Sequence, residues 1–205
     1  MRYTPHFVTT DPEEVKKLIR ENPWSTIVAN TSKGLVATHY PVLLEENLDE
    51  ISIVGHVGRP EERTLELGSG EWLVVIQGAH GYISPGWYGE IPAVPTWNHS
   101  TAHLYGVPEV LSDDENWQVL DRMVEHFEHV MPHPKLLKDN EEYGRSIFDG
   151  TVGFRMRVTR FEARLKLSQN KSDSIKQTVI GELDHGAHYS QPRLAADMTR
   201  VNGIK

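Results

Sequence analysis

Hydrophobic and polar positions along much of the chain alternate with the two-residue period of β-strands. After residue 159 the apolar positions change parity, which predicts a β-bulge or a turn at this point. Short strands joined by tight polar turns are typical of an antiparallel meander. Strands are expected over 25–30, 35–44, 51–57, 72–77, 80–84, 102–110 and 152–161.

Helical periodicity occupies fewer segments. Pro12 opens a first helix that Pro23 ends, and Pro60 opens a brief second one. Ser112 and Glu115 have the spacing of a capping box ahead of the longest apolar stripe, whose members recur every three or four residues. Shorter helices are expected over 140–148 and 174–183.

These elements predict one mainly β (α+β) domain over residues 1–184, a sheet closed on itself with flanking helices. Residues 185–205 are polar and weakly patterned, so we expect a tail that is mobile or docked on a partner. The stretch 84–98 is rich in proline, glycine and aromatic residues and has neither period. Long connections of this kind inside a compact domain are usually functional.

Composition excludes several classes of protein. With 38% hydrophobic residues the 205-residue chain can build a core, and the lack of cysteine excludes disulfides, thiolate metal sites and a cysteine nucleophile. The formal net charge of −8 argues against a face that coats nucleic acid, although residues 155–176 carry seven basic and only two acidic side chains. Without a signal-like N-terminus or a long apolar run, we expect a cytoplasmic protein with no membrane contact.

No catalytic residue stands out. His99 and His103 are four residues apart, but their context is typical of a strand, where one metal ion cannot bridge them. We therefore predict no metal site. The chain also lacks a Walker loop, a dinucleotide-binding glycine motif and a nucleophile elbow.

Two segments can hold a phosphorylated ligand. In the segment 55–60 a strand end, Arg59 and a helix start come together, which suits a phosphate but equally suits a plain turn. The segment 166–172 places two lysines, two hydroxyls and two amides after a strand, which suits a phosphate and a polar ring edge, or a solvated turn. Trp87 and Trp97 can stack on a flat ligand or fill the core below their loop.

Three blocks of the chain resemble those of the PaiB-type transcriptional regulators. They are His-Gly-Tyr-Ile-Ser-Pro-Gly-Trp-Tyr at 80–88, Val-Pro-Thr-Trp-Asn at 94–98 and Lys-Leu-Ser-Gln-Asn-Lys-Ser at 166–172. Shorter matches at 3–7, 37–41, 55–56 and 152–154 extend the resemblance to about residues 3–183.

This resemblance implies an FMN-binding split β-barrel, related to pyridoxamine phosphate oxidases and flavin reductases, that forms a homodimer with flavin sites between subunits. It implies a negative transcriptional regulator or ligand sensor. Because no helix-turn-helix is visible and the net charge is unfavourable outside residues 155–176, we expect any DNA contact to be weak or indirect. A flavin-dependent oxidoreductase is the alternative, and haem binding through a histidine is a third. The FMN-binding residues expected on this basis are Thr38, His39, His56, Arg59, Trp87, Trp97, Lys166, Ser168 and Gln169.

In the implied geometry, the strand 35–44 presents its backbone to the flavin ring and Arg59 receives the phosphate. The segment 166–169 closes the site, with Lys166 as a second phosphate cation. The chain departs from the family pattern beside this site. The family usually has Ala-Arg-x-Asn-Pro where this chain has Gly58-Arg59-Pro60-Glu61, so the arginine persists and the asparagine is lost.

Overall fold

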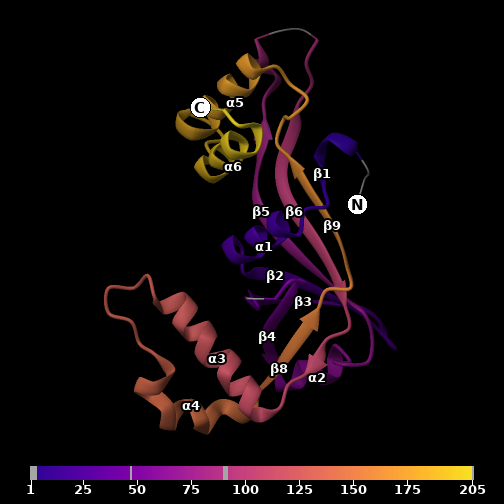
Figure 1. Cartoon of the computed structure of the whole chain (residues 1–205), viewed down its shortest axis with the longest axis vertical. Helices are drawn as coiled ribbons and strands as arrows, with labels where there is room; N and C mark the ends of the chain where they lie inside the picture. The colour runs from indigo at the N-terminus through magenta and orange to yellow at the C-terminus, as the bar shows by residue number, and fades with distance from the viewer. Residues whose placement is uncertain (1–3, 47, 90–91, 205) are drawn as a thin grey trace. The chain divides into compact units, whose positions relative to one another are not determined.

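The structure is a computed structural model that describes residues 4–46, 48–89 and 92–204 (Figure 1). The described strands are β1 (Val8–Thr9), β2 (Trp24–Thr31), β3 (Gly34–Leu44), β4 (Ser52–Gly58), β5 (Trp72–Ile83), β6 (Thr96–Gly106), β7 (Glu109–Val110), β8 (Thr151–Arg157) and β9 (Arg160–Lys166). The described α-helices are α1 (Pro12–Glu21), α2 (Arg59–Thr64), α3 (Asp113–Glu128), α4 (Glu141–Ile147), α5 (Asp173–His185) and α6 (Pro192–Asn202). Within the described residues, no helix combines the length and the apolar composition needed to span a bilayer.

The chain divides into two compact units. Unit 1 comprises the described residues of Met1–Leu18, Gln77–Ala102 and Glu162–Lys205, and unit 2 comprises those of Ile19–Ile76 and His103–Phe161. The hydrogen-bonded strand order is β1-β9-β6-β5 in unit 1 and β5-β2-β3-β4-β8-β7 in unit 2. Strand β3 pairs antiparallel with both β2 and β4, and β4 pairs antiparallel with β8, as expected for a meander.

Most predicted elements are confirmed. The first helix, the three early strands, the longest helix and the short helices α4 and α5 lie within a few residues of their expected bounds. The capping box is present, because the Ser112 hydroxyl accepts from the Glu115 N–H at 3.4 Å while the Ser112 N–H donates to the Glu115 carboxylate at 3.1 Å. The parity change after residue 159 marks a turn, since β8 ends at Arg157 and β9 begins at Arg160.

Two strands differ from the prediction. The expected break between 77 and 80 is absent and β5 runs unbroken, because Gly78 serves close packing in unit 1 and not a turn. A Cβ atom there would lie 2.6 Å from Leu18 Cδ1 and 3.2 Å from Ser100 Cβ. Strand β6 begins at Thr96, so the last part of the aperiodic stretch is already sheet.

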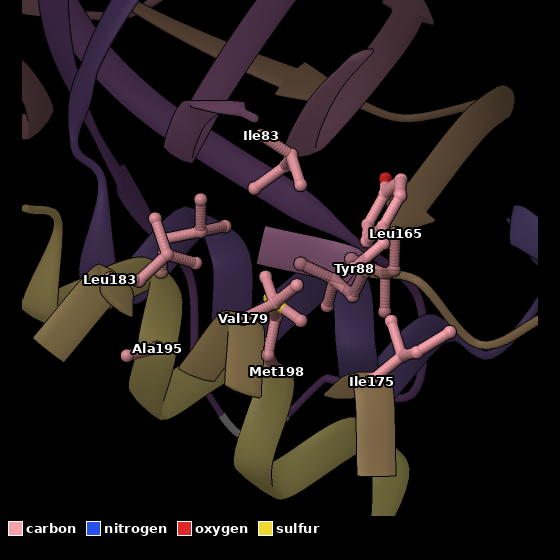
Figure 2. Close-up of a cluster of buried hydrophobic side chains, with 10 residues drawn as sticks. Ile83, Tyr88, Leu165, Ile175, Val179, Leu183, Ala195 and Met198 are labelled. Atoms are coloured by element: carbon pink, nitrogen blue, oxygen red, sulfur yellow. The ribbon is translucent and has the colours of Figure 1, made fainter. Parts of the chain in front are cut away.

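The segment after residue 185 contains a helix that the sequence analysis did not predict. In α6, Leu194, Ala195 and Met198 are buried against α5, whose Val179 and Leu183 are fully buried (Figure 2). Figure 2 shows Val179, Leu183 and Met198 of the two helices gathered in one cluster with Ile83 and Leu165 from the sheet of unit 1. Arg200 of α6 also forms a bidentate ion pair with Glu14 at 2.6 and 2.8 Å. The sequence carries usable signals for α6, because Leu194, Met198 and Val201 recur at helical spacing between Pro192 and Gly203, and the prediction missed them.

The core of unit 2 lies on both sides of its sheet. Trp72 and Phe154 are fully buried, with ring centroids 5.2 Å apart in an edge-on contact. On the other side, Val119 and Met123 of α3 pack against Val54 of β4. This packing sets α3 across β4 and β8, the strands that lead toward the predicted phosphate site.

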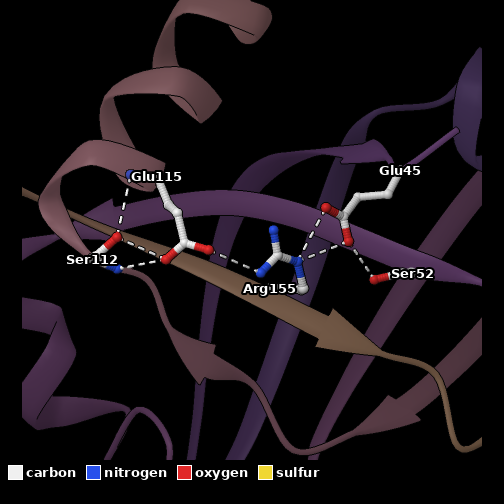
Figure 3. A network of polar contacts seen from close by, with 5 residues as sticks. All are labelled: Glu45, Ser52, Ser112, Glu115 and Arg155. Atoms are coloured by element: carbon white, nitrogen blue, oxygen red, sulfur yellow. Dashed lines mark hydrogen bonds and ion pairs between the residues drawn. The ribbon is translucent and has the colours of Figure 1, made fainter.

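Arg155 of β8 joins two carboxylates in unit 2 (Figure 3). Its Nε donates to the Glu45 carboxylate at 3.0 Å, and its Nη1 donates to the Glu115 carboxylate at 3.3 Å. The Glu45 carboxylate also accepts a hydrogen bond from the Ser52 hydroxyl at 2.6 Å. The Glu45 side chain is only 13% exposed, so its charge depends on this partner. Donors from Ser112, followed by Arg155, hold the pKa of Glu115 below its usual range.

We expect Arg155→Ala to lower the free energy of unfolding by about 1–3 kcal/mol, because it leaves the Glu45 carboxylate poorly solvated and unpaired. Chemical denaturation followed by circular dichroism measures the change. Arg157→Ala on the same strand is the control, since that side chain is 63% exposed and lies 3.7 Å from Glu50. Its loss is expected to cost less than about 0.5 kcal/mol, and equal losses in the two variants would contradict the role given to Glu45.

Candidate functional site

The nine predicted site residues fall into two groups, one in each unit. Thr38 and His39 lie on β3, His56 lies on β4, and Arg59 is the first residue of α2, all in unit 2. The other five lie in unit 1: Trp87, Trp97, Lys166, Ser168 and Gln169. Each group is therefore described by itself.

Strand β3 changes its partner halfway along its length. Residues 34–41 pair with β2, whereas the pairs with β4 in the described chain cover residues 42–44. Backbone groups of residues 38–40 on the side away from β2 thus lie outside the β3–β4 ladder. This is the backbone that the sequence analysis expects to face a flavin ring.

Thr38 and His39 point to opposite faces of β3, as neighbours on a strand must. The Thr38 hydroxyl donates to Glu61 Oε1 at 2.9 Å. The exposed His39 ring stacks on Trp24 with centroids 6.4 Å apart. The two side chains therefore cannot both contact a ligand that lies on one face of the strand.

Tyr40 and Glu61 complete a polar cluster at the start of α2. The Tyr40 hydroxyl donates to Glu61 Oε2 and accepts from the Gly58 N–H at 3.0 Å. Burial, and then the bond to Glu61, raise the pKa of Tyr40, so its proton stays in place at neutral pH. With Thr38 and Tyr40 both donating to Glu61, a carboxylate lies where the sequence analysis expects a phosphate.

Arg59 makes three contacts within unit 2. Its Nε donates to the Asp149 carbonyl at 3.1 Å, its Nη2 donates to the Thr151 carbonyl at 3.0 Å, and its Nη1 lies 3.5 Å from Glu62. A guanidinium has five N–H donors, so further donors remain for an anion. Arg59 thus fastens α2 to the start of β8 and still offers hydrogen bonds outward.

His56 has an unsatisfied polar atom. Its Nδ1 is buried without a hydrogen-bond partner in the described structure, and its ring meets the Tyr40 ring edge-on at 5.9 Å. Burial lowers the pKa of His56, which keeps the imidazole neutral. His56 and Pro41 line a largely apolar cavity of about 430 Å³ together with side chains of α3: Leu120, Met123, Val124 and Phe127.

In unit 1 the predicted residues have different surroundings. Trp87 packs against the core around α5 and α6, and Trp97 is 57% exposed with its ring edge-on to Tyr82. The Gln169 side chain accepts from the Leu167 N–H at 2.8 Å and donates to the Leu165 carbonyl, so its amide is used to end β9. Lys166 and Ser168 line a separate pocket.

Four residues of these two groups were not among the site residues predicted from the sequence: Tyr40, Glu61, Asn98 and Lys171. Tyr40 lies two residues from Thr38 and so on the same face of β3, which is a usable signal. In the sequence, Glu61 is an ordinary acidic residue in the first turn of a helix. Nothing in the neighbouring residues indicates that its side chain contacts β3. Asn98 and Lys171 were inside the quoted motifs, but their contacts depend on how β6 and β9 come together.

The basic strip over 155–176 is largely neutralised in the structure. Four of its seven cations have a carboxylate partner, namely Arg155, Arg157, Arg160 and Lys176. Such a strip offers little charge to a phosphate backbone. The remaining cations, Arg164, Lys166 and Lys171, all belong to unit 1.

Comparison with known proteins gives consistent results. The family model described as "Putative FMN-binding domain" matches residues 1–160. A Bacillus subtilis protein, "Protease synthase and sporulation protein PAI 2", is 34% identical over 197 residues, covering 94% of each chain.

Solved structures show the fold. The FAD- and haem-binding protein of Mycobacterium smegmatis matches with a TM-score of 0.56 at 17% identity, covering 78% of this chain and 73% of that one. The flavocytochrome Anf3 of Azotobacter vinelandii matches with a TM-score of 0.57 at 13% identity, covering 77% and 68%. These likenesses confirm the predicted fold class, a mainly β split barrel with flanking helices.

Proposed function

Because the chain belongs to the FMN-binding family of PaiB-type proteins, we propose that it is a homodimeric, cytoplasmic FMN-binding regulator or ligand sensor. The family match supports FMN as the ligand, since it covers residues 1–160 and includes the whole predicted group of unit 2. The regulatory role and the dimer rest on the resemblance to PaiB-type regulators. Any DNA contact is expected to be weak or indirect, because the formal net charge is −8.

The observation that carries the flavin proposal is the change of partner along β3. Between residues 38 and 40 this strand leaves backbone N–H and C=O groups outside the β3–β4 ladder, beside Arg59 and the end of β4. The polar edge of a flavin ring carries donors and acceptors that suit such a backbone edge. Thr38 and Arg59 would then lie nearest to the ribityl phosphate.

The residues of unit 2 fit a planar ligand. The buried Nδ1 of His56 has no hydrogen-bond partner in the described structure, and the adjoining cavity of about 430 Å³ has mostly apolar walls. A neutral imidazole can donate to or accept from a ring atom according to its tautomer. FMN, when bound, supplies redox chemistry that the side chains themselves lack.

The electrostatic environment of the proposed phosphate position is less favourable. Glu61 accepts hydrogen bonds from Thr38 and Tyr40 at the start of α2, so its negative charge lies beside the proposed phosphate position. Arg59 remains the cation that offsets this charge. The balance of these two side chains is expected to set the affinity for FMN.

Titration of the purified protein with FMN, followed by flavin fluorescence and absorption, tests the proposal. Arg59→Ala is expected to weaken FMN binding about ten- to a hundredfold, because a charge-assisted hydrogen bond contributes about 1.5–3 kcal/mol. Arg157→Ala is the control, since Arg157 is an exposed arginine paired with Glu50. No flavin binding by the wild-type protein would overturn the proposal, and equal losses in the two variants would remove Arg59 from the site.

A further inference from the structure

We propose that a surface pocket of unit 1 binds the phosphate group of a small molecule other than the flavin. The pocket has a volume of about 420 Å³, within the usual range for small-molecule sites. It is formed by the start of β6, the end of β9 and the residues that follow. Its polar lining consists of Thr96, Asn98, Lys166, Ser168, Asn170 and Lys171.

The pocket has an excess of positive charge. Its described lining holds two lysines and no carboxylate, and within the part of the chain that the structure describes neither lysine has an acidic partner within 4.0 Å. Arg164, two residues from Lys166 and on the same face of β9, has a buried Nε with no hydrogen-bond partner there. Burial, and then the charge of Arg164, lower the pKa of Lys166. An anion in the pocket would relieve this repulsion.

Both lysines are held in position without being neutralised. The Lys166 ammonium donates to the Thr96 hydroxyl and to the Trp97 carbonyl, which leaves one of its three N–H groups for a ligand. The Lys171 ammonium lies 4.7 Å from the centroid of the Tyr88 ring, a cation–π contact. Fixing the cations in advance lowers the entropy lost when an anion binds.

A buried amide holds the hydroxyl of Ser168, which also lines the pocket. Asn98 is 1% exposed, and its Nδ2 donates to the Ser168 hydroxyl oxygen at 2.9 Å. Ser168 therefore acts as acceptor toward Asn98, and its own proton is directed elsewhere. Its φ of 62° lies in the left-handed region, which is unfavourable for a non-glycine residue and is common at binding sites.

The remaining lining is apolar and indicates the rest of the ligand. Phe7, Tyr88, Ala93 and Val94 contribute aromatic and aliphatic surface beside the polar group. A free inorganic phosphate would leave this surface in contact with water. A phosphate monoester with an apolar or aromatic body would cover it.

The pocket is distinct from the residues on which the flavin proposal rests. Its lining belongs to unit 1 and includes none of the four predicted residues of unit 2, Thr38, His39, His56 and Arg59. Lys166 and Ser168, predicted from the sequence to bind FMN, would therefore bind the phosphate of another ligand. This second site goes beyond the proposed function, because it assigns unit 1 a ligand other than FMN. Such a ligand is what a sensor protein would detect.

Isothermal titration with phenyl phosphate in phosphate-free buffer tests the proposal. We expect saturable binding to the wild-type protein and none of phenol, its uncharged counterpart. Lys171→Gln and Lys166→Met are each expected to weaken phenyl phosphate binding by about tenfold. Lys176→Gln is the matched control, because that lysine lies in the same unit and is paired with Asp173 at 3.1 Å.

Absence of phenyl phosphate binding would overturn the proposal, as would an equal loss in Lys176→Gln. If saturating FMN abolishes phenyl phosphate binding, the pocket belongs to the flavin, and this result would overturn the proposal as well. Lys171 lies outside the described strands, so the Lys171→Gln variant decides between these outcomes even where Lys166→Met disturbs β9. FMN binding to Lys171→Gln is expected to equal that of the wild type. Failure of every variant to bind FMN would count against the proposed function alone.

Discussion

Replacing Glu61 with glutamine is expected to tighten FMN binding by about tenfold or more and to leave riboflavin binding unchanged. The Glu61 carboxylate accepts from Thr38 at 2.9 Å and from Tyr40, next to Arg59 at the start of α2. A phosphate dianion placed there is repelled by the carboxylate, whereas riboflavin has no phosphate to repel. Glutamine removes the charge and keeps one acceptor oxygen, while its amide nitrogen, which is a donor, takes the place of the other oxygen.

The comparison of the two flavins separates local repulsion from other effects. Glu66→Gln is the control, because it removes the same charge from the segment after α2, where Glu66 bonds to Ser32 at 3.0 Å. Fluorescence titrations of both variants with FMN and riboflavin give the required ratios. If Glu66→Gln tightens FMN binding as much as Glu61→Gln, net charge is responsible. If neither variant changes it, the phosphate does not approach Glu61.

Leu183→Ala is expected to lower the free energy of unfolding of unit 1 by about 2–5 kcal/mol. Leu183 of α5 is fully buried in the cluster of Figure 2, which also includes Leu194 and Met198 of α6. Truncation removes favourable burial and leaves a cavity, because the surrounding helices and strands can close it only in part.

Urea unfolding monitored by circular dichroism measures this loss. Gln177→Ala on α5 is the control, since Gln177 is exposed and its change should stay within about 0.5 kcal/mol. A comparably small loss for Leu183→Ala would mean that α5 and α6 are not held by this cluster.

Much of the fold follows from local patterns in the sequence. The alternation in 25–57 predicts β2, β3 and β4 with nearly their observed bounds, because a half-buried strand requires a period of two. The Ser112–Glu115 pair predicts the start of α3, because the capping groups and the N–H groups that they satisfy lie within one turn. The motif blocks indicate the family, which the comparisons confirm.

Predictions that depended on the partner of a segment were less successful. Gly78 has the features of a strand break by itself, yet it lies inside β5 because Leu18 and Ser100 need the space of its missing side chain. Helix α6 was missed although Leu194, Met198 and Val201 recur at helical spacing, and its packing on α5 explains why these positions are apolar. For Gly78 the deciding contacts come from residues distant in sequence.

The sequence by itself determined most of the elements, the cap formed by Ser112 and Glu115, and the family, and it predicted Arg59 and Lys166 as candidate cations. Tertiary structure decided that Thr38 and Tyr40 meet Glu61, and that Lys166 and Lys171 share a pocket with Asn98. Periodicity and capping act over a few residues, so they can be seen in a short stretch of chain. Strand register and helix docking join residues far apart in sequence, and a shift of one residue in register would turn every side chain of a strand to its other face.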